Sequence, residues 1–198
     1  MISIFLIGLN INTPYEETLN AYQKLLTTGK IRAIGASNLD AGQLKTALDV
    51  ANSQNLPRYQ VLQPEYNIYD RAAFDDKLKK LCIKENIGVV TYYSLASGFL
   101  TGKYRRQSDL NSSLRKSDID KYLNQRGERI LKALQVVADA HQATLAEVAL
   151  AWLMAFNGIT APIASATTVA QVESFVKAIN LTLTKAQFEY IDYESKLN

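Results

Sequence analysis

The sequence predicts an α/β fold built on a parallel sheet, and two observations support this. Five short apolar runs alternate regularly with longer amphipathic segments along the chain. Each connection is long enough for the right-handed crossover that parallel strands require. No internal repeat, low-complexity tract or interdomain linker interrupts the 198 residues, so we expect one domain over residues 1–198.

The expected strands are short and apolar. Residues 2–8 form a continuous apolar run, which is typical of a strand buried on both faces. A signal peptide is the alternative for this run, but no basic residue precedes it and it is too short to span a bilayer. The other strands are predicted at residues 31–36, 59–63, 88–92 and 159–163.

The expected helices fill the segments between these strands. We expect Thr13 to cap the first helix, with Pro14 at its first position, and Gly29 to end it. A long polar loop is predicted from residue 93 to about 118, and its length suggests a lid or a binding loop. The remaining helices are predicted at about residues 39–54, 72–85, 119–141, 144–156, 168–179 and 184–195.

Composition and charge exclude several classes of function. Apolar residues make up 47% of the chain and charged residues 21%, as in ordinary soluble domains. The net charge of +3 is scattered, so we expect no nucleic-acid partner, and no segment has membrane length. The single cysteine, Cys82, lies in an apolar helical run, which predicts a buried thiol and favours a reducing, cytoplasmic compartment. We expect no metal site.

Small polar residues end two neighbouring strands. Ser37 and Asn38 follow the strand 31–36, and Gln63 ends the next strand along the chain. Ligands of parallel α/β barrels bind at this rim, and hydroxyl and amide groups suit a carboxamide, which needs both donors and acceptors. The alternative is structural, with Ser37 and Asn38 capping the following helix and Gln63 simply ending its strand. The spacing alone favours that alternative.

Three further features suit a nucleotide, and each has a simpler interpretation. Tyr92 ends a strand and can stack on a flat ring, or it is a rim aromatic that covers the core. The glycines of residues 94–104 allow close backbone approach, and Lys103 can reach a phosphate, unless this is a plain loop with a solvated lysine. Residues 162–168 lead to a helix N-terminus, where backbone N–H groups favour the binding of a phosphate. The simpler interpretation is that Thr168 only caps this helix.

The order and spacing of these blocks resemble the aldo-keto reductase family from about residue 13 to the C-terminus. The loop over residues 94–104 is most similar to the bacterial branch of that family. The resemblance implies a partial TIM (β/α)8 barrel, holding about strands 4–8 with their helices. It also implies that residues 13–198 form a truncated barrel domain preceded by a degenerate strand within residues 1–12. NADP(H) and a small-molecule carbonyl substrate are the implied ligands.

The same resemblance assigns a cofactor-binding role to residues spread over most of the chain. They are Ser37, Asn38 and Gln63 at the nicotinamide carboxamide, Tyr92 stacked on its ring, Leu95, Gly98, Lys103 and Arg115 at the phosphates, and Thr167, Gln171 and Ser174 at the adenosine end. Family members often carry Gly where this chain has Ser165, and a basic residue near Thr168. Because that base is absent, NAD stays open beside NADP.

The family's catalytic residues have no counterpart in this chain. The resemblance implies Asp, Tyr and Lys on early strands and His at the end of the fourth, a position that falls near Ile7 or Gly8 here. The only histidine is His141, at a predicted helix C-terminus, where we expect it to be solvated. We therefore expect no catalytic residue and no reductase activity from the chain alone.

Three functional interpretations follow from this pattern. The chain is an inactive oxidoreductase homologue, half of an enzyme completed by another chain, or a non-catalytic nucleotide-binding or interaction module. An incomplete barrel would expose backbone edges on its first and last strands, near residues 2–8 and 159–163. We therefore expect self-association or pairing with a complementary half-barrel.

Overall fold

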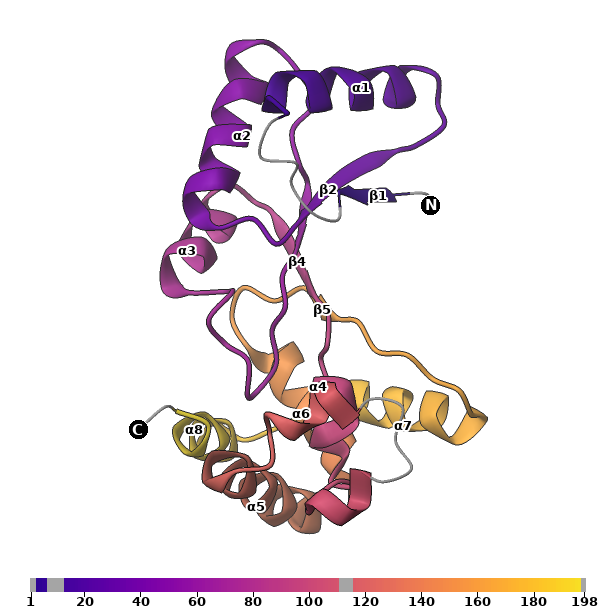
Figure 1. Ribbon diagram of the computed structural model, residues 1–198, viewed down its shortest axis with the longest axis vertical. Coiled ribbons are helices and arrows are strands. Elements are labelled where there is room, and N and C mark those ends of the chain that lie inside the picture. Colours follow the sequence, from indigo (N-terminus) through magenta and orange to yellow (C-terminus); the bar gives the residue numbers. More distant parts are fainter. Residues whose placement is uncertain (1–2, 7–12, 111–115, 197–198) are drawn as a thin grey trace. The chain divides into compact units, whose positions relative to one another are not determined.

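The computed structural model describes residues 3–6, 13–110 and 116–196. They belong to two compact units: Met1–Glu65 with Ala72–Val90, and Tyr66–Arg71 with Thr91–Asn198. In Figure 1 the first unit runs from indigo to magenta, and most of the second runs from magenta to yellow. The single-domain expectation stays a prediction.

The first unit contains a parallel sheet. Its strands are β1 (Ser3–Leu6), β2 (Ala33–Ser37), β3 (Val61–Gln63) and β4 (Gly88–Thr91), hydrogen-bonded in that order. All three pairings are parallel, and Ser37 of β2 stands in register with Gln63 of β3. The prediction of a parallel α/β fold is confirmed, whereas the barrel itself stays a prediction.

Helices of the first unit connect the strands and bury one face each. They are α1 (Tyr15–Thr27), α2 (Ala41–Ser53) and α3 (Asp76–Lys84). Figure 1 draws α1 and α2 next to each other, and the two helices are in contact. Leu19 of α1, Leu44 of α2 and Leu62 of β3 are fully buried and contribute to the apolar interior of this unit.

The start of α1 differs from the expectation. Pro14, not Thr13, occupies the N-cap position, and no side chain caps the helix there. Pro14 has an extended ψ of 143°, so regular helix geometry begins only at Tyr15. Proline has no backbone N–H, which means one donor of the first turn needs no cap, and the helix tolerates the missing side-chain bond.

The second unit is mainly helical. Its elements are the 3₁₀ segments η1 (Ala96–Thr101) and η2 (Gln107–Leu110), the helices α4 (Lys116–Asp120), α5 (Gln125–His141), α6 (Leu145–Ala155), α7 (Val169–Asn180) and α8 (Lys185–Glu194), and the strand β5 (Ala161–Pro162). The backbone N–H of Ile163 donates to the carbonyl of Thr91 over 2.8 Å, and both residues belong to this unit. Thr144 and Glu147 form a capping box at the start of α6.

Two expectations for residues 93–141 are wrong. The predicted polar loop contains η1, η2 and α4 instead of irregular chain alone. The predicted helix 119–141 is two helices, because Asn124 adopts an extended backbone (φ −146°, ψ 178°) and caps α5 by accepting from the N–H of Gly127. An asparagine that can cap competes with helix continuation, and here the cap prevails.

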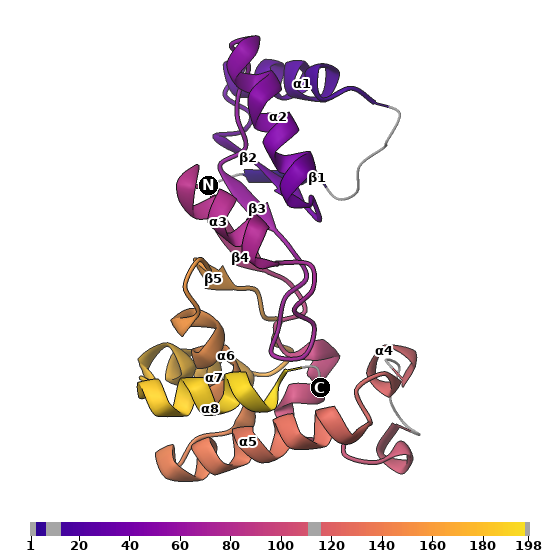
Figure 2. The same cartoon turned by 90° about the vertical axis from the view of Figure 1, so that its left-hand side faces the viewer.

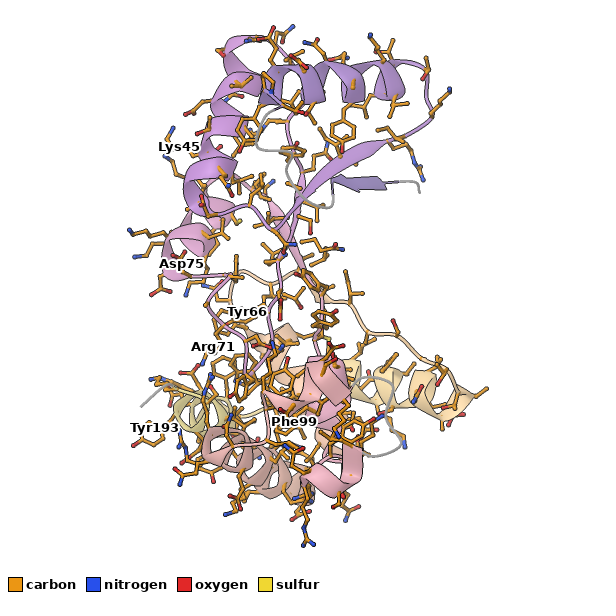
Figure 3. The ribbon with its side chains drawn as sticks, in the orientation of Figure 1. Lys45, Tyr66, Arg71, Asp75, Phe99 and Tyr193 are labelled. Carbon is orange, nitrogen blue, oxygen red and sulfur yellow. The ribbon has the colours of Figure 1, made fainter. Side chains whose placement is uncertain are left out.

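The core of the second unit centres on the single tryptophan. Trp152 is fully buried and stacks on Phe188 of α8 at 5.3 Å between ring centroids. The Arg71 guanidinium lies over the Trp152 ring at 5.0 Å and forms a 2.6 Å ion pair with Asp192. Arg71 and Tyr66 are labelled in Figure 3. Helices α5 and α8 lie alongside each other, as Figure 2 shows. These contacts tie α8 to the second unit.

Cys82 provides a test of this packing. The thiol lies in α3 with 1% of its surface exposed, and burial raises its pKa from 9.0 to about 11. At pH 8 the thiolate fraction is therefore about 100-fold lower than in the unfolded chain. We expect labelling by a thiol reagent such as DTNB to be at least that much slower in the folded chain, and rapid labelling before denaturation would contradict this burial. The predicted buried thiol is confirmed, whereas the cytoplasmic location stays a prediction.

Candidate functional site

The strand-end residues of the first unit meet around one carbonyl group. The Ser37 hydroxyl donates to the backbone carbonyl of Gln63 over 2.9 Å, and the backbone N–H of Asn38 donates to the same oxygen over 3.2 Å. Asn38 turns the chain away from β2 with a left-handed φ of 58°. These bonds follow directly from the register of Ser37 with Gln63. The predicted convergence at one end of the sheet is present.

The structural alternative for Ser37 and Asn38 is wrong. The N-cap of α2 is Asp40, whose carboxylate accepts from the backbone N–H of Gln43 at 2.8 Å. Gln43 returns the contact, because its side-chain oxygen accepts from the backbone N–H of Asp40. This capping box satisfies the start of the helix without help from the strand end. Ser37 and Asn38 are therefore not needed as caps.

The side chain of Gln63 is available for a ligand. It is half-buried, and within the described residues its amide group has no hydrogen-bond partner. Ser37 is 3% exposed, and its oxygen still has acceptor capacity after donating its one proton. The pair therefore presents two amide donors and two acceptor oxygens side by side, which is what a planar carboxamide needs.

Tyr92 lies just beyond β4, in the second unit. Its ring is half-buried and lies 5.2 Å from the ring of Tyr93, tilted by 57°. The Tyr92 carbonyl accepts from the backbone N–H of Tyr66 at 3.4 Å. Tyr93 has a left-handed φ of 54° and a side chain that is 51% exposed, so the aromatic pair is partly open to solvent.

The segment from Leu95 to Lys103 is a tight double turn. Ser97 and Gly98 have positive φ values of 55° and 97°, and the Leu95 carbonyl accepts from the backbone N–H of Gly98. A Cβ added at Gly98 would meet Cε of Lys103 at 3.2 Å, so Lys103 folds directly over this glycine. Its ammonium also lies 4.8 Å from the ring of Tyr104. The turn thus places the Lys103 side chain against Gly98.

The residues predicted for the adenosine end lie at the start of α7. Thr168 is the N-cap and accepts from the backbone N–H of Gln171, so the structural interpretation of Thr168 is confirmed. The Gln171 side chain accepts from the backbone N–H of Thr167 at 2.7 Å. Ser174, one turn further, is half-buried. Gln171 is already engaged in ordering the turn, which leaves its amide N–H₂ for a ligand.

Two further predicted positions have different outcomes. Arg115 lies outside the described residues. His141 is in the last turn of α5, where its Nε2 is 3.0 Å from the side-chain oxygen of Gln187, so it is packed against another side chain and not simply solvated. Over the described ranges, no three His, Cys, Asp or Glu side chains gather where they could hold a metal ion. In the same residues no helix is both long and apolar enough to cross a bilayer.

One cavity of about 530 Å³ lies in the second unit, and its lining includes none of the predicted site residues that the structure describes. Its lining combines aromatic and aliphatic floor residues with exposed charged groups: Phe99, Arg105, Arg106, Gln107, Tyr122, Leu123, Asn124, Gln125, Glu128, Leu131 and Lys132. The Arg105 side chain already donates to the Gly102 carbonyl and to Gln135. The adjacent arginines that follow Tyr104 were the only sequence signal for this region.

A family model and several known proteins match the chain. The model described as "Aldo/keto reductase family" matches residues 9–195. A "Probable voltage-gated potassium channel subunit beta" of Arabidopsis thaliana is 31% identical over 177 residues, covering 86% of this chain and 53% of that protein. The "NADH-specific methylglyoxal reductase" of Escherichia coli K12 is 32% identical over 180 residues, covering 88% and 52%.

A solved structure supports the same relationship. The thermostable aldo-keto reductase Tm1743, crystallised with the inhibitor epalrestat, aligns with a TM-score of 0.75 and 26% identity. The alignment covers 97% of this chain and 59% of that one. The chain spans about half the length of the curated relatives it matches.

Proposed function

Because this chain belongs to the aldo/keto reductase family, we propose that it binds NAD(P)H through the strand ends of its first unit. The observation that carries the proposal is the half-buried Gln63 amide, which has no partner within the described residues and lies beside Ser37. A half-buried amide without a protein partner can bind a ligand without first breaking an existing hydrogen bond. A nicotinamide carboxamide can both donate a hydrogen bond to this group and accept one from it.

Each strand-end residue has a separate task in this proposal. Gln63 donates to the carboxamide oxygen and accepts from its nitrogen, whereas Ser37 offers only its oxygen because its proton is held by the Gln63 carbonyl. The β2–β3 register holds both side chains on rigid strands, so little entropy is lost on binding. The bound cofactor would supply the hydride for carbonyl reduction.

Residues of the second unit carry the other cofactor roles that the family resemblance assigns. Tyr92 would stack on the nicotinamide, and the turn formed by Leu95, Gly98 and Lys103 would hold the pyrophosphate. The Lys103 ammonium lies beside the Gly98 turn and would supply a mobile positive charge for a phosphate. Thr167, Gln171 and Ser174 would line the adenosine end. We assign the cofactor as NADP(H), with NAD as the alternative, and Arg115 as a further phosphate contact.

A titration tests this proposal. NADPH and NADH fluorescence is followed as the 198-residue chain is added, and the Gln63→Ala variant should bind about tenfold more weakly, because one or two hydrogen bonds are lost. Gln60→Ala is the matched control, since Gln60 is exposed and precedes the same strand. Tyr92→Ala tests the stacking contact. Binding that is unchanged in Gln63→Ala, or absent from the parent chain, would contradict the site.

A second candidate function is a nucleotide-binding module that does not catalyse. Two relatives, from Arabidopsis thaliana and Oryza sativa, carry the name of a probable channel subunit and not of a reductase. The same titration separates the candidates when it is combined with an activity assay. NADPH binding without aldehyde reduction favours the module, and binding with reduction favours the enzyme.

The proposed fold is a partial barrel that pairs with a complementary half-barrel. We propose that the four parallel strands of the first unit, with β5, correspond to strands 4–8 of the family's (β/α)8 barrel. β1 has one strand neighbour, β2, within the described residues. Pairing through that open edge with a complementary half-barrel would complete a reductase that acts on a small-molecule carbonyl substrate.

A further inference from the structure

The turn that follows α6 contains the only Asn-Gly pair of the sequence, Asn157-Gly158. These two residues occupy the centre of a four-residue turn, which closes where the backbone N–H of Ile159 donates to the Phe156 carbonyl over 3.1 Å. Gly158 has a φ of 96°, in the left-handed region that favours glycine at the third position of such a turn. The Asn157 side chain is exposed, so water reaches it.

Neither the Asn157 amide nor the Gly158 N–H is held by a hydrogen bond. Within the described residues both groups are without a partner. The geometry of the turn explains the second of these, because only the N–H of the fourth residue bonds back to the first carbonyl. The Gly158 nitrogen also has no side chain beside it that would hinder approach to the Asn157 side chain.

We propose that Asn157 is a site of spontaneous deamidation. The backbone nitrogen of Gly158 attacks Cγ of Asn157 and loses its proton to water, so a new C–N bond closes a five-membered imide. The bond from Cγ to the side-chain nitrogen breaks, and ammonia leaves. Water then opens the imide at one of its two carbonyls and produces aspartate or isoaspartate. Nothing is oxidised or reduced, and water is the only co-reactant.

Two other asparagines provide an internal comparison. Asn55 and Asn86 follow α2 and α3, are exposed, and have a left-handed φ of 54°. The next residues, Leu56 and Ile87, donate their backbone N–H to carbonyls in the last turn of each helix, over 2.9 and 2.8 Å. Attack at these positions must first break that bond and move past a branched side chain. Asn157 therefore differs from them in having a follower that is free to react.

The modification would act on the aromatic core of the second unit. Isoaspartate adds one carbon to the main chain inside the turn, which breaks the bond from Ile159 to Phe156. The Phe156 ring lies 5.2 Å from that of Trp152, so the single tryptophan reports on the change. Either product also sets a carboxylate just beyond the negative end of the α6 dipole. We expect the modified chain to unfold about 2–5 °C lower than the parent.

Peptide mapping by mass spectrometry tests the site after the 198-residue chain is incubated in mildly alkaline buffer. The Asn157 peptide should gain the mass difference between an amide and an acid, and an isoaspartyl methyltransferase should label it. Its rate in the folded chain should be within about tenfold of the rate in the chemically unfolded chain, since no structure has to open first. Asn157 that stays intact in the folded chain while it reacts in the unfolded chain would overturn the proposal.

Leu56→Gly is the matched control, because it places the same dipeptide after α2 in a turn whose N–H is hydrogen-bonded. In this variant Asn55 should react at least about tenfold more slowly than Asn157 of the same chain, since the bond must open before attack. Equal rates at the two asparagines, in a variant that circular dichroism shows to be folded, would contradict the assignment. If Leu56→Gly does not fold, the folded and unfolded parent chains decide the question.

Discussion

Replacing Gly127 by alanine is expected to lower the free energy of unfolding by about 3 kcal/mol or more. Gly127 lies in the first turn of α5, where an added Cβ would overlap the backbone carbonyl oxygen of Tyr122. The same Cβ would lie 2.9 Å from Cζ of Phe99. The nearest obstacle is backbone, which cannot rotate away as a flexible side chain can.

The surroundings of Gly127 leave little room for relaxation. Tyr122 stacks on Phe99 at 5.1 Å between ring centroids, and its hydroxyl donates to Asp70 over 2.6 Å. The Asn124 cap also binds the N–H of Gly127 itself at 3.0 Å. Moving α5 away to admit a methyl group would therefore break the cap or unstack two buried rings.

Chemical denaturation followed by circular dichroism measures this effect. Gly42→Ala is the control, because Gly42 also lies in the first turn of a helix and its added Cβ would meet only the Asp40 side chain, at 3.3 Å. There the helix preference of alanine offsets the tight contact, so the change should stay within about 0.5 kcal/mol. Equal stability changes in the two variants would show that α5 can move away from Tyr122.

The sequence predicts the fold because the spacing of apolar residues differs between the strand segments and the helix segments of this chain. Continuous apolar runs and amphipathic segments are local signals, and each predicted element that is described exists within a few residues of its expected place. The errors occur where two local preferences compete. Asn124 suits both a helix interior and a cap, and Pro14 suits both a first helical position and an N-cap. Only the surrounding chain decides between these states.

The candidate site likewise has a part that the sequence predicts and a part that it does not. Strand ends converge in any parallel sheet, so the meeting of Ser37, Asn38 and Gln63 follows from the order of the strands. The fold of Lys103 over Gly98 depends on positive φ values at Ala96 and Ser97, which are not glycines, and no sequence rule anticipates them. The cavity beside Arg105 and Arg106 likewise arises from contacts with α5, which lies distant in sequence.

The 198-residue chain by itself is expected to reduce aldehydes with NADPH at least about 10²-fold more slowly than a full-length relative. General acid catalysis contributes about 10²–10⁴-fold, and it needs a group that can deliver a proton to the carbonyl oxygen. The only histidine, His141, is packed on Gln187 at the end of α5. The prediction is checked by following NADPH absorbance with an aromatic aldehyde, and a rate within about tenfold of the relative would contradict it.

Tyr59, a buried tyrosine of the first unit, cannot take over this role. Burial, followed by the nearby Tyr22 and Tyr15, raises the pKa of Tyr59, so its phenol is a weaker acid than usual. Tyr59 is also 1% exposed, and its hydroxyl has no hydrogen-bond partner within the described residues. A group that neither reaches solvent nor releases its proton readily cannot protonate a substrate. We therefore expect this chain to bind the cofactor without transferring a proton to a substrate.

A complementation experiment distinguishes half of an enzyme from a non-catalytic module. The first half of a full-length relative is added to the chain, and NADPH turnover is measured with and without it. Turnover that appears only in the mixture would identify the chain as half of an enzyme, whose Gln63 and Ser37 hold a cofactor for a proton donor on the other half. Binding without turnover in either case would favour the non-catalytic module. In both outcomes Gln63→Ala should reduce NADPH binding, because the carboxamide contact does not depend on the proton donor.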